Sequence, residues 1–449
     1  MTSARAVLLA ALPAALLAAG CTGGKEPPVA TDAPQVILIT LDTFRADHMG
    51  CAGSPTVRTP RLDQLARRGT QWSGAVTPIP LTTPSHASIL SGAHPRDHGL
   101  VANRMRLRPS VATIPSVLGA RGLNSAAVVS SPIVLGRELG LDRGFAKYRI
   151  IPEQYRLAPG QGVWTTNAAL ELLSGNPDFL WVHYFDAHLP YTPPAPMGLL
   201  YGVPGPYGSG EDLHEAQTRF REGPEPAREE VQAMTARYAA EVTFLDACVG
   251  TVVRAAPGAT ILLTADHGEG LFDHDRYFGH DIHLYEPSLR VPLLAAGAGV
   301  DAGRLVQTGV ATTDVAPTIL AMFGMDAPSG MTGRDLLRDP PGEGDAPPLF
   351  AETHPLPEKG RPLYALRTEK HKVVWEPRAG RWRYYDLVAD PAEQTDLSEE
   401  RSQYLEMLES DLRRDLTSRP PLGARPIRAE SAEEEANVRD ALRSLGYVN

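Results

Sequence analysis

The sequence is poor in cysteine and in positive charge. It holds three cysteines in 449 residues, too few and too widely spaced for a disulfide framework or a thiolate zinc site. Its 53 Asp and Glu outnumber its 43 Lys and Arg, and the formal net charge of −10 excludes a general nucleic-acid binder, which needs a basic face. Hydrophobic residues at 43% and charged residues at 21% exclude wholesale disorder and allow a large core.

The single long apolar run lies at the N-terminus, and no later stretch approaches transmembrane length. Met1–Gly20 carries a positive charge at Arg5, is interrupted by Pro13 and ends in small residues before Cys21. This segment resembles a bacterial lipoprotein signal with Cys21 as the lipidated residue, the alternative being an ordinary cleaved signal peptide. We therefore expect an exported protein, lipid-anchored at the periplasmic or surface side of the cell envelope, with residues 21–33 as a flexible tether.

Beyond the tether, short apolar runs alternate with helical segments. The runs are almost continuously hydrophobic and are bounded by turn residues, which is typical of strands buried on both faces. The alternation predicts an α/β fold over residues 34–340, with a mostly parallel sheet sandwiched by helices. The expected strands are Val36–Leu41, Ser125–Val129, Phe179–Phe185, Thr260–Thr264 and Val291–Ala296, and the expected helices include Arg61–Arg68, Ile114–Ala120 and Arg228–Ala255.

The character of the sequence changes near residue 340, where a Pro- and Gly-rich segment precedes short alternating segments. Such alternation predicts an antiparallel sheet with exposed faces. A polar helix is expected around Gln403–Leu416, and an acidic helix is expected at the end of the chain. Residues 341–449 are thus predicted to form a smaller α+β subdomain with a helical tail, with strands at Tyr364–Thr368, Lys372–Glu376 and Arg381–Leu387.

Three of the expected strands end in acidic or imidazole groups. Asp42 ends the first strand, Asp186 and His188 follow the third, and Asp266 and His267 follow the fourth. A single Asp after a strand is more often a helix cap than a metal ligand. Because parallel sheets bind ligands beyond the carboxyl ends of their strands, three such ends indicate a divalent-metal site. Asp and His together suit Zn²⁺ or Mn²⁺, whereas an all-oxygen set would suit Ca²⁺ or Mg²⁺.

Residues 81–92, LTTPSHASILSG, predict a helix with a hydroxyl group at its N-terminus. Thr82 or Thr83 is expected to cap the helix, and Pro84 is tolerated in its first turn. The unpaired amides and the helix dipole favour an anion there, either a threonine alkoxide or a bound phosphate or sulfate. The motif alone is typical of a capped helix, but beside the metal-type strand ends it indicates a nucleophile.

Six segments, in this order, resemble the sulfatase family of the alkaline-phosphatase superfamily. They are LITLDTFRADHMG, TPRLDQLARRGTQWSGAVTPIPLTTPSHASILSGAHPRDHGL, WVHYFDAHLPYTPP, LLTADHGEG, GHDIHLYEPSLRVPLL and YYDLVADPAEQTDL. The resemblance runs from about Gln35 to the C-terminus and implies that family's fold. It also implies a metal-dependent hydrolase of sulfuric or phosphoric esters, of sulfatase or phosphodiesterase type, whose anionic substrate is a small molecule, a glycan or a lipid head group.

The nucleophile position departs from the sulfatase pattern. Sulfatases carry Cys or Ser, any residue, Pro, Ser and Arg there, and oxidise the first residue to formylglycine. Thr82 and His86 stand at the first and last of these positions, and threonine cannot be oxidised in the same way. The pattern is similar to that of nucleotide pyrophosphatase/phosphodiesterases, and lipoteichoic-acid synthases and phosphoethanolamine transferases also use a threonine. With Thr43 and His267 replacing the family's frequent Asp and Asn, the resemblance favours Zn²⁺ or Mn²⁺ and a phosphate ester.

The resemblance also implies a role for each site residue. Asp42, Asp266 and His267 would hold the divalent metal with the Thr82 hydroxyl, which would lose its proton and form a covalent ester with the substrate. His280 would protonate the leaving oxygen, with His283 as a weaker candidate that also contacts substrate. The remaining roles belong to residues around the substrate's anionic group: His188 as a catalytic and substrate-binding residue, Asn103 as a substrate ligand, and His86 in orienting Thr82 or holding the anion.

Two other function classes stay open. A transferase would pass a phosphorus-containing head group from a lipid to a glycan or lipid, although such relatives usually carry several transmembrane helices. A non-catalytic binding lipoprotein would keep the fold without turnover, as the absence of Cys or Ser at position 82 allows. Asp186 is a candidate for a second metal, and the neighbouring polar residues Arg45, Asp47, His48, His94 and His98 are predicted to be structural.

Overall fold

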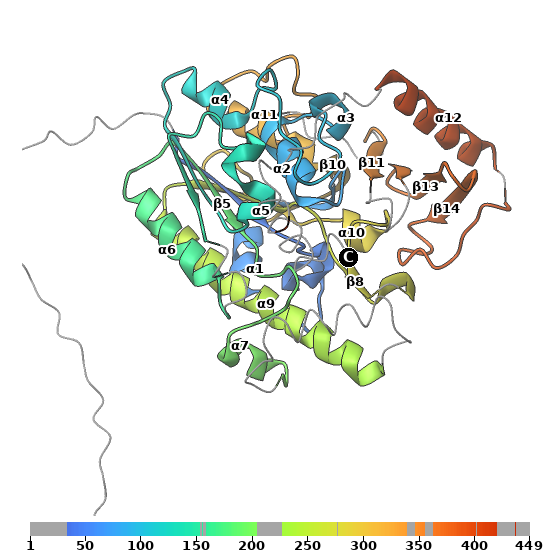
Figure 1. Ribbon diagram of the computed structural model, residues 1–449, viewed down its shortest axis with the longest axis horizontal. Helices are drawn as coiled ribbons and strands as arrows, with labels where there is room; N and C mark the ends of the chain where they lie inside the picture. The colour runs from blue at the N-terminus through green and yellow to red at the C-terminus, as the bar shows by residue number, and fades with distance from the viewer. Residues whose placement is uncertain are drawn as a thin grey trace, which may run out of the picture. The chain divides into compact units, whose positions relative to one another are not determined.

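The computed structural model in Figure 1 describes residues 34–152, 155, 159–203, 227–275, 277–338, 346–354, 362–400, 402–419 and 436. The expected signal peptide, tether and acidic C-terminal helix lie outside these residues. Residues Pro34–Asn449 belong to one compact unit. The expected boundary at residues 340 and 341 also falls outside the described residues and stays a prediction.

An eight-stranded sheet forms the centre of this unit, in the order β10-β2-β9-β6-β1-β5-β3-β4. Neighbouring strands are parallel except at β9, which runs antiparallel to both β2 and β6. The predicted α/β class with a mostly parallel sheet is therefore confirmed. The strands are β1 Val36–Leu41, β2 Thr70–Val76, β3 Ser125–Val129, β4 Lys147–Ile150, β5 Phe179–Tyr184, β6 Thr260–Ala265, β9 Leu293–Ala296 and β10 Arg304–Ala311.

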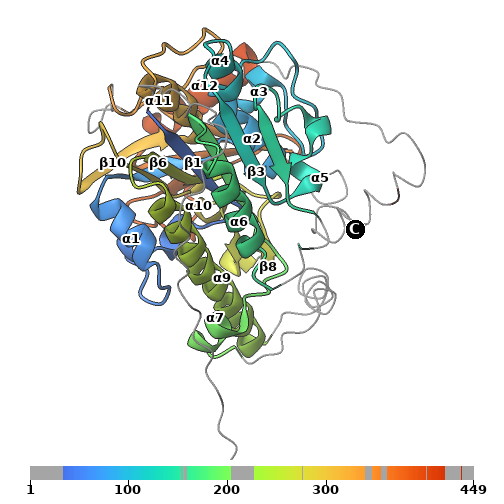
Figure 2. The same ribbon diagram turned by 90° about the vertical axis from the view of Figure 1, so that its left-hand side faces the viewer.

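Helices cover both faces of the sheet, with α1, α6 and α9 on one side and α2, α4 and α11 on the other (Figures 1 and 2). The helix expected at Arg228–Ala255 is present with those bounds as α9. Within the described ranges, no helix combines the length and hydrophobicity needed to cross a membrane. The other helices are α1 Pro60–Arg67, α2 Thr82–Ser91, α3 Pro95–His98, α4 Ile114–Gly119, α5 Pro132–Leu135, α6 Gly162–Leu173, α7 Ala195–Leu200, α10 Glu286–Leu289 and α11 Val315–Met322.

Strands β2, β4 and β10 were not predicted from the sequence. Strand β2, TQWSGAV, contains Gly74, a residue that weakens isolated strands. At this glycine a Cβ atom would lie only 2.7 Å from the Gln307 carbonyl oxygen, so the close approach of β10 requires a residue without a side chain. Strand β4 is at the edge of the sheet and keeps exposed polar side chains.

The start of helix α2 corrects the expected cap. Leu81 is the residue before the helix, and Thr82 and Thr83 are its first two residues, so neither threonine caps it. The capping contact comes instead from Asn103, whose Oδ1 accepts a hydrogen bond of 2.9 Å from the Thr83 amide. Thr82 is thereby held in the first helical turn.

A four-stranded antiparallel sheet, β11 Leu349–Thr353, β12 Leu363–Arg367, β13 His371–Glu376 and β14 Arg381–Asp386, follows in the C-terminal part. The expected antiparallel sheet is confirmed, but the expectation that its faces are exposed is wrong. One face packs against α12 Gln403–Ser418, and the other against the segment around α10, because apolar residues occupy both sides of the strands. The two clusters are Leu366, Val373, Tyr384, Leu405, Leu408 and Leu412, and Ala365, Val374, Tyr385, Leu284 and Leu289.

Candidate active site

The acids at the ends of β1 and β6 meet at the same edge of the sheet. These strands are parallel neighbours, and Leu41 at the end of β1 pairs with Ala265 at the end of β6. Asp42 and Asp266 are the next residue along each strand, so they lie beside each other. Asp42, Asp266 and His267 are completely buried, and each offers a ligand atom within 4.8 Å of the others. The structure therefore brings together the three residues predicted to hold a metal.

The hydrogen bonds of this group leave ligand atoms available. Asp266 Oδ1 accepts the amides of Thr43 at 3.2 Å and His267 at 2.8 Å. Within the described residues, Asp266 Oδ2 and both carboxylate oxygens of Asp42 have no hydrogen-bond partner. Buried carboxylate oxygens without donors are costly. A divalent cation would satisfy them, so this donor set fits the metal that the resemblance implies.

Burial shifts the pKa of each member of the group toward its neutral form. Desolvation raises the pKa of Asp42 and of Asp266 well above the usual range for a carboxyl group. Desolvation also lowers the pKa of His267 well below its usual value, which keeps the imidazole neutral and able to bind a metal. Two buried carboxylates carry their charge only beside a positive partner.

Thr82 and Thr83 lie side by side but face different groups. The Thr83 hydroxyl donates to the Val134 carbonyl oxygen at 2.7 Å. Thr82 Oγ1 lies 3.5 Å from His267 Nε2, so its hydroxyl faces the acidic group. Of the two threonines, Thr82 is the one placed to act as a nucleophile there.

His86 contacts the backbone of the first turn of α2. Its Nδ1 lies 2.8 Å from the Thr82 carbonyl oxygen and its Nε2 lies 3.2 Å from Thr40 Oγ1. Burial lowers the pKa of His86 well below its usual value, so the ring is neutral and Nδ1 donates to the carbonyl oxygen. This geometry suits the role of orienting Thr82 better than that of holding an anion.

His188 and His280 surround the group on another side. The His280 ring stacks on His267 with centroids 4.2 Å apart, and the edge of His188 meets His280 at 5.4 Å. The His188 ring stacks on Phe185, and its Nδ1 donates to the Leu189 carbonyl oxygen at 2.8 Å. His280 thus contacts both His188 and His267, and His267 in turn contacts Thr82.

The remaining predicted substrate residues lie on either side of this cluster. Asn103 joins it through its hydrogen bond with Thr83, and its amide nitrogen is buried with no partner among the residues that the structure describes. His283 Nδ1 lies 3.5 Å from Ser288 Oγ. A Cβ atom at Gly270 would lie 3.7 Å from the His283 ring, which places this ring beside the segment that follows His267.

Two functional candidates were missed by sequence reasoning. Glu269 Oε1 lies 3.4 Å from His280 Nδ1, and its Oε2 accepts the Tyr191 hydroxyl at 3.1 Å. His183 Nε2 lies 3.4 Å from Asp42 Oδ2. A histidine inside an otherwise apolar strand and a glutamate three residues after the metal-type Asp266 were the available signals, because each needs a polar partner when buried.

Of the five polar residues predicted to be structural, four have hydrogen-bond partners, whereas the ring nitrogens of His94 have none among the described residues. Arg45 pairs with Asp47 at 2.8 Å and with Asp273, and His48 Nδ1 also contacts Asp47. His98 Nε2 lies 2.9 Å from Ser88 Oγ. Asp186, the candidate for a second metal, is not a member of the group formed by Asp42 and its neighbours.

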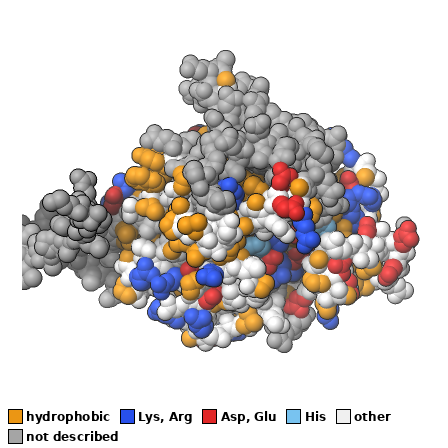
Figure 3. All heavy atoms as spheres, turned by 90° about the horizontal axis from the view of Figure 1, so that it is seen from below, with side chains coloured by type: hydrophobic (Ala, Val, Ile, Leu, Met, Phe, Trp, Pro, Cys, Tyr) orange, Lys and Arg blue, Asp and Glu red, His pale blue; other side chains and the backbone are white. Residues whose placement is uncertain are grey.

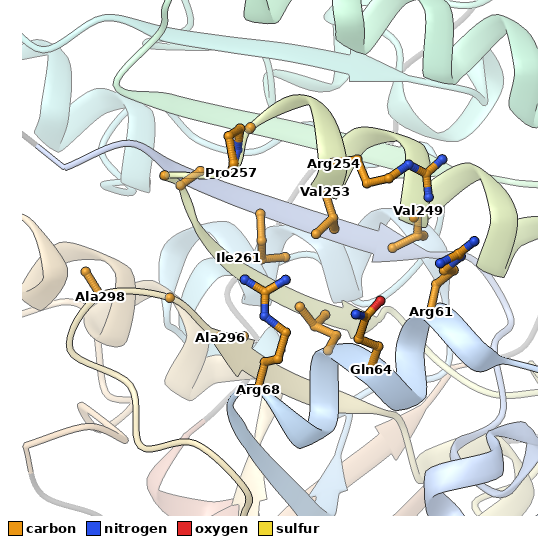
Figure 4. Close-up of a pocket in the computed structure, with 16 residues that line it drawn as sticks. Arg61, Gln64, Arg68, Val249, Val253, Arg254, Pro257, Ile261, Ala296 and Ala298 are labelled. Carbon is orange, nitrogen blue, oxygen red and sulfur yellow. The ribbon is translucent and has the colours of Figure 1, made fainter.

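A hollow of about 680 Å³ lies at the opposite edge of the sheet, where β6 begins (Figure 4). Arg61, Arg68 and Arg254 surround an apolar floor there that includes Val253 and Ile261. Because it lies at the amino ends of the parallel strands, this hollow is separate from the residues described above. Figure 3 shows the molecule from below relative to Figure 1, and histidine side chains are visible there between acidic and basic ones.

Comparison with known proteins agrees with this geometry. Residues 34–325 match the family model described as sulfatase, and residues 270–419 match the C-terminal model of N-sulphoglucosamine sulphohydrolase. An ulvan-active sulfatase of Formosa agariphila is 25% identical over 402 residues, which cover 81% of this chain and 77% of the relative.

Two solved structures share the fold. A protein in complex with its substrate D-glucosamine-2-N,6-O-disulfate superimposes with a TM-score of 0.73 at 18% identity, covering 86% of this chain and 98% of the other. The phosphonate monoester hydrolase of Agrobacterium radiobacter gives 0.71 at 20% identity, covering 86% and 95%. The chain therefore belongs to the sulfatase family of the alkaline-phosphatase superfamily and is an ester hydrolase of the sulfatase type.

Proposed function

We propose that this hydrolase cleaves phosphate or sulfate esters with Thr82 as the nucleophile and forms a covalent Thr82 ester. The observation that carries the proposal is the contact of Thr82 Oγ1 with His267, beside buried oxygens of Asp42 and Asp266 that no described donor satisfies. A divalent metal held by these residues would lower the pKa of the Thr82 hydroxyl and neutralise negative charge on the substrate.

The surrounding residues supply proton transfer and binding. His280 would give a proton to the leaving oxygen while Thr82 Oγ forms its bond to phosphorus or sulfur. Glu269 would orient the His280 ring through Nδ1. His280 would then take a proton from the water that attacks the Thr82 ester. The bond from Thr82 Oγ to phosphorus or sulfur would break, releasing phosphate or sulfate and the Thr82 alkoxide that the next attack needs, while His280 would again carry the proton for the next leaving oxygen. Asn103 and His188 would contact the oxygens of the transferred group.

The substrate class follows from the nucleophile. Because threonine cannot form formylglycine in the way that cysteine or serine does, we favour a phosphorus ester and Zn²⁺ or Mn²⁺, with Ca²⁺ or Mg²⁺ as alternatives. The likeness to a phosphonate monoester hydrolase supports this choice. The ulvan-active sulfatase and the neighbour solved with a glucosamine disulfate support a sulfated glycan as the second candidate.

Paired p-nitrophenyl esters would test the proposal. A sulfate, a phosphate monoester and a phosphate diester would be compared with Zn²⁺, Mn²⁺ and Ca²⁺, using Thr82→Ala and the matched control Thr83→Ala. We expect metal-dependent turnover that Thr82→Ala abolishes and Thr83→Ala retains, because the Thr83 hydroxyl bonds to the Val134 carbonyl. Equal turnover in wild type and Thr82→Ala would refute the nucleophile, whereas no turnover of any ester would favour the transferase or binding-protein alternatives.

A further inference from the structure

A second pair of buried carboxyl groups lies behind His188. Asp186 follows β5 and is 7% exposed, and Glu241 lies within α9 and is 2% exposed. One oxygen of Asp186 accepts the Gly162 amide at 2.6 Å, at the N-terminus of α6, and the Thr192 amide donates to Glu241. Over the described ranges of the chain, Asp186 Oδ2 and Glu241 Oε2 have no hydrogen-bond partner.

Both carboxyl groups line one small cavity, which has room for a single ion or water molecule. Gln161 and Thr192 also line it. Gln161 donates its amide nitrogen to the Ser130 carbonyl oxygen at 2.9 Å, which leaves its amide oxygen as the remaining polar atom of the side chain. The residues that line the cavity therefore include two carboxyl groups, each with an unpartnered oxygen among the described residues, and the polar side chains of Gln161 and Thr192.

The neighbouring groups offset only part of the cost of burying charge on these two carboxyl groups. Burial raises the pKa of Asp186 to about 7 and that of Glu241 well above its usual value, and the negative charge of Asp186 raises the pKa of Glu241 further. The α6 N-terminus and the two amides favour the charged forms. The two remaining oxygens still require either a proton or a cation.

We propose that Asp186 and Glu241 hold one Ca²⁺ ion in this cavity, separate from the group formed by Asp42, Asp266 and His267. Oxygen ligands from two carboxylates match the preference of this hard cation, and two negative charges balance its charge. His188 forms another part of the cavity wall, so the ion would fix the segment that carries it. The proposal does not depend on the identity of the nucleophile.

Calcium binding by the purified full chain tests this site without an activity assay. After chelator treatment, equilibrium dialysis would measure bound Ca²⁺ for Asp42→Asn, which disables the other metal group, and for Asp42→Asn combined with Glu241→Gln. We expect one bound Ca²⁺ per chain in the first variant and none in the second. Ca²⁺ should also raise the thermal unfolding midpoint of the first variant but leave that of the second unchanged.

Two results would overturn the proposal. The first is the absence of bound Ca²⁺ in Asp42→Asn, which indicates that the carboxyl groups share a proton or hold water. The second is equal binding by both variants, which places the ion elsewhere. Glu241→Gln preserves the volume of the side chain and an acceptor for the Thr192 amide, and Asp186→Asn provides an independent variant with the same expected loss.

Discussion

At the scale of single residues, Thr82 is the proposed nucleophile, His280 the proposed acid and Glu269 the carboxylate proposed to orient His280. The contribution of proton donation by His280 depends on the leaving group of the substrate. A good leaving group such as p-nitrophenolate departs without a proton, whereas an alkoxide needs one in the transition state. This difference separates proton donation from the nucleophilic step.

We therefore predict that His280→Ala slows cleavage of an alkyl phosphate by about 10²–10⁴-fold but slows p-nitrophenyl phosphate much less. Glu269→Gln should show the same pattern to a smaller degree, because it weakens the contact with His280 Nδ1 but leaves the His280 ring in place. The ratio kcat/KM for the two substrates measures the effect, because it reports the steps up to formation of the Thr82 ester and not the later hydrolysis that both substrates share. An equal loss on both substrates would contradict the acid role, and His48→Gln serves as a control outside the cluster.

His98 provides a residue-scale prediction on pH. Burial lowers the pKa of His98 to about 3, whereas the same group in an unfolded chain has a pKa of 6.5. Between pH 3 and pH 6.5 the folded state therefore binds fewer protons than the unfolded state. The stabilising contribution is therefore complete above pH 6.5 and is lost as the pH falls toward 3, by up to about 1.4 kcal/mol per pH unit.

Urea unfolding at pH 7, 6 and 5 would measure this loss. We expect a steeper decline in the free energy of unfolding for wild type than for His98→Gln, since glutamine does not titrate. Parallel declines in the two proteins would show that His98 does not contribute to the acid sensitivity.

Among single residues, the buried acids of the site could be predicted from the sequence, but the residues that contact the site's acids and histidines could not. Asp42 and Asp266 were predictable because they end apolar runs, and parallel strands place such residues at one edge. His183 and Glu269 were not predicted because their role depends on which strands are neighbours, and that pairing is a property of the folded sheet. Asn103 was identified from the family resemblance alone, since 20 residues separate it from its partner Thr83.

At the scale of elements, the C-terminal sheet is tied to the segment that carries His280 and His283. Glu286 in α10 contacts Arg367 of β12 at 3.0 Å and Lys372 of β13 at 3.2 Å. Burial would raise the pKa of Glu286, but these two cations outweigh burial and lower it to about 2. The C-terminal sheet thereby holds one wall of the site.

Removing one buried cation should loosen that connection. We predict that Lys372→Met lowers the free energy of unfolding by about 3–5 kcal/mol, because it leaves buried carboxylates unbalanced. Arg381→Met removes an exposed pair with Glu376 and should lower it by at most about 1 kcal/mol. Denaturant unfolding of both variants measures the difference, and equal losses would refute the structural role of the network.

Elements could be predicted where their burial is uniform along the segment. Strands β1, β3, β5 and β6 are buried at every position and appear in the sequence as continuous apolar runs. Strand β10 has exposed positions at its start, and β2 contains a glycine required by its neighbour, so neither shows such a run. The packed faces of the C-terminal sheet were missed because one of them is covered by the distant segment around α10, and because the docking of α12 on the other depends on tertiary packing.

At the scale of the whole molecule, the expected signal peptide and tether would place the catalytic unit outside the cytoplasm. We predict that the mature protein carries a lipid on Cys21 and fractionates with membranes. Labelling cells with a fatty-acid analogue would show incorporation into wild type and none into Cys21→Ala. Cys51→Ala is the matched control and should label normally, because its thiol lies within the compact unit. Labelling that persists in Cys21→Ala would contradict the anchor.

Trapping the covalent ester would test directly whether Thr82 is the nucleophile. His280→Ala would be mixed with p-nitrophenyl phosphate or p-nitrophenyl sulfate and quenched in acid, and its peptides would be examined by mass spectrometry. We expect one phosphoryl or sulfuryl group on the peptide that contains Thr82, located on that residue and lost in Thr82→Ala. A variant that turns over the ester while the group appears on another residue, or on none, would contradict the proposed nucleophile.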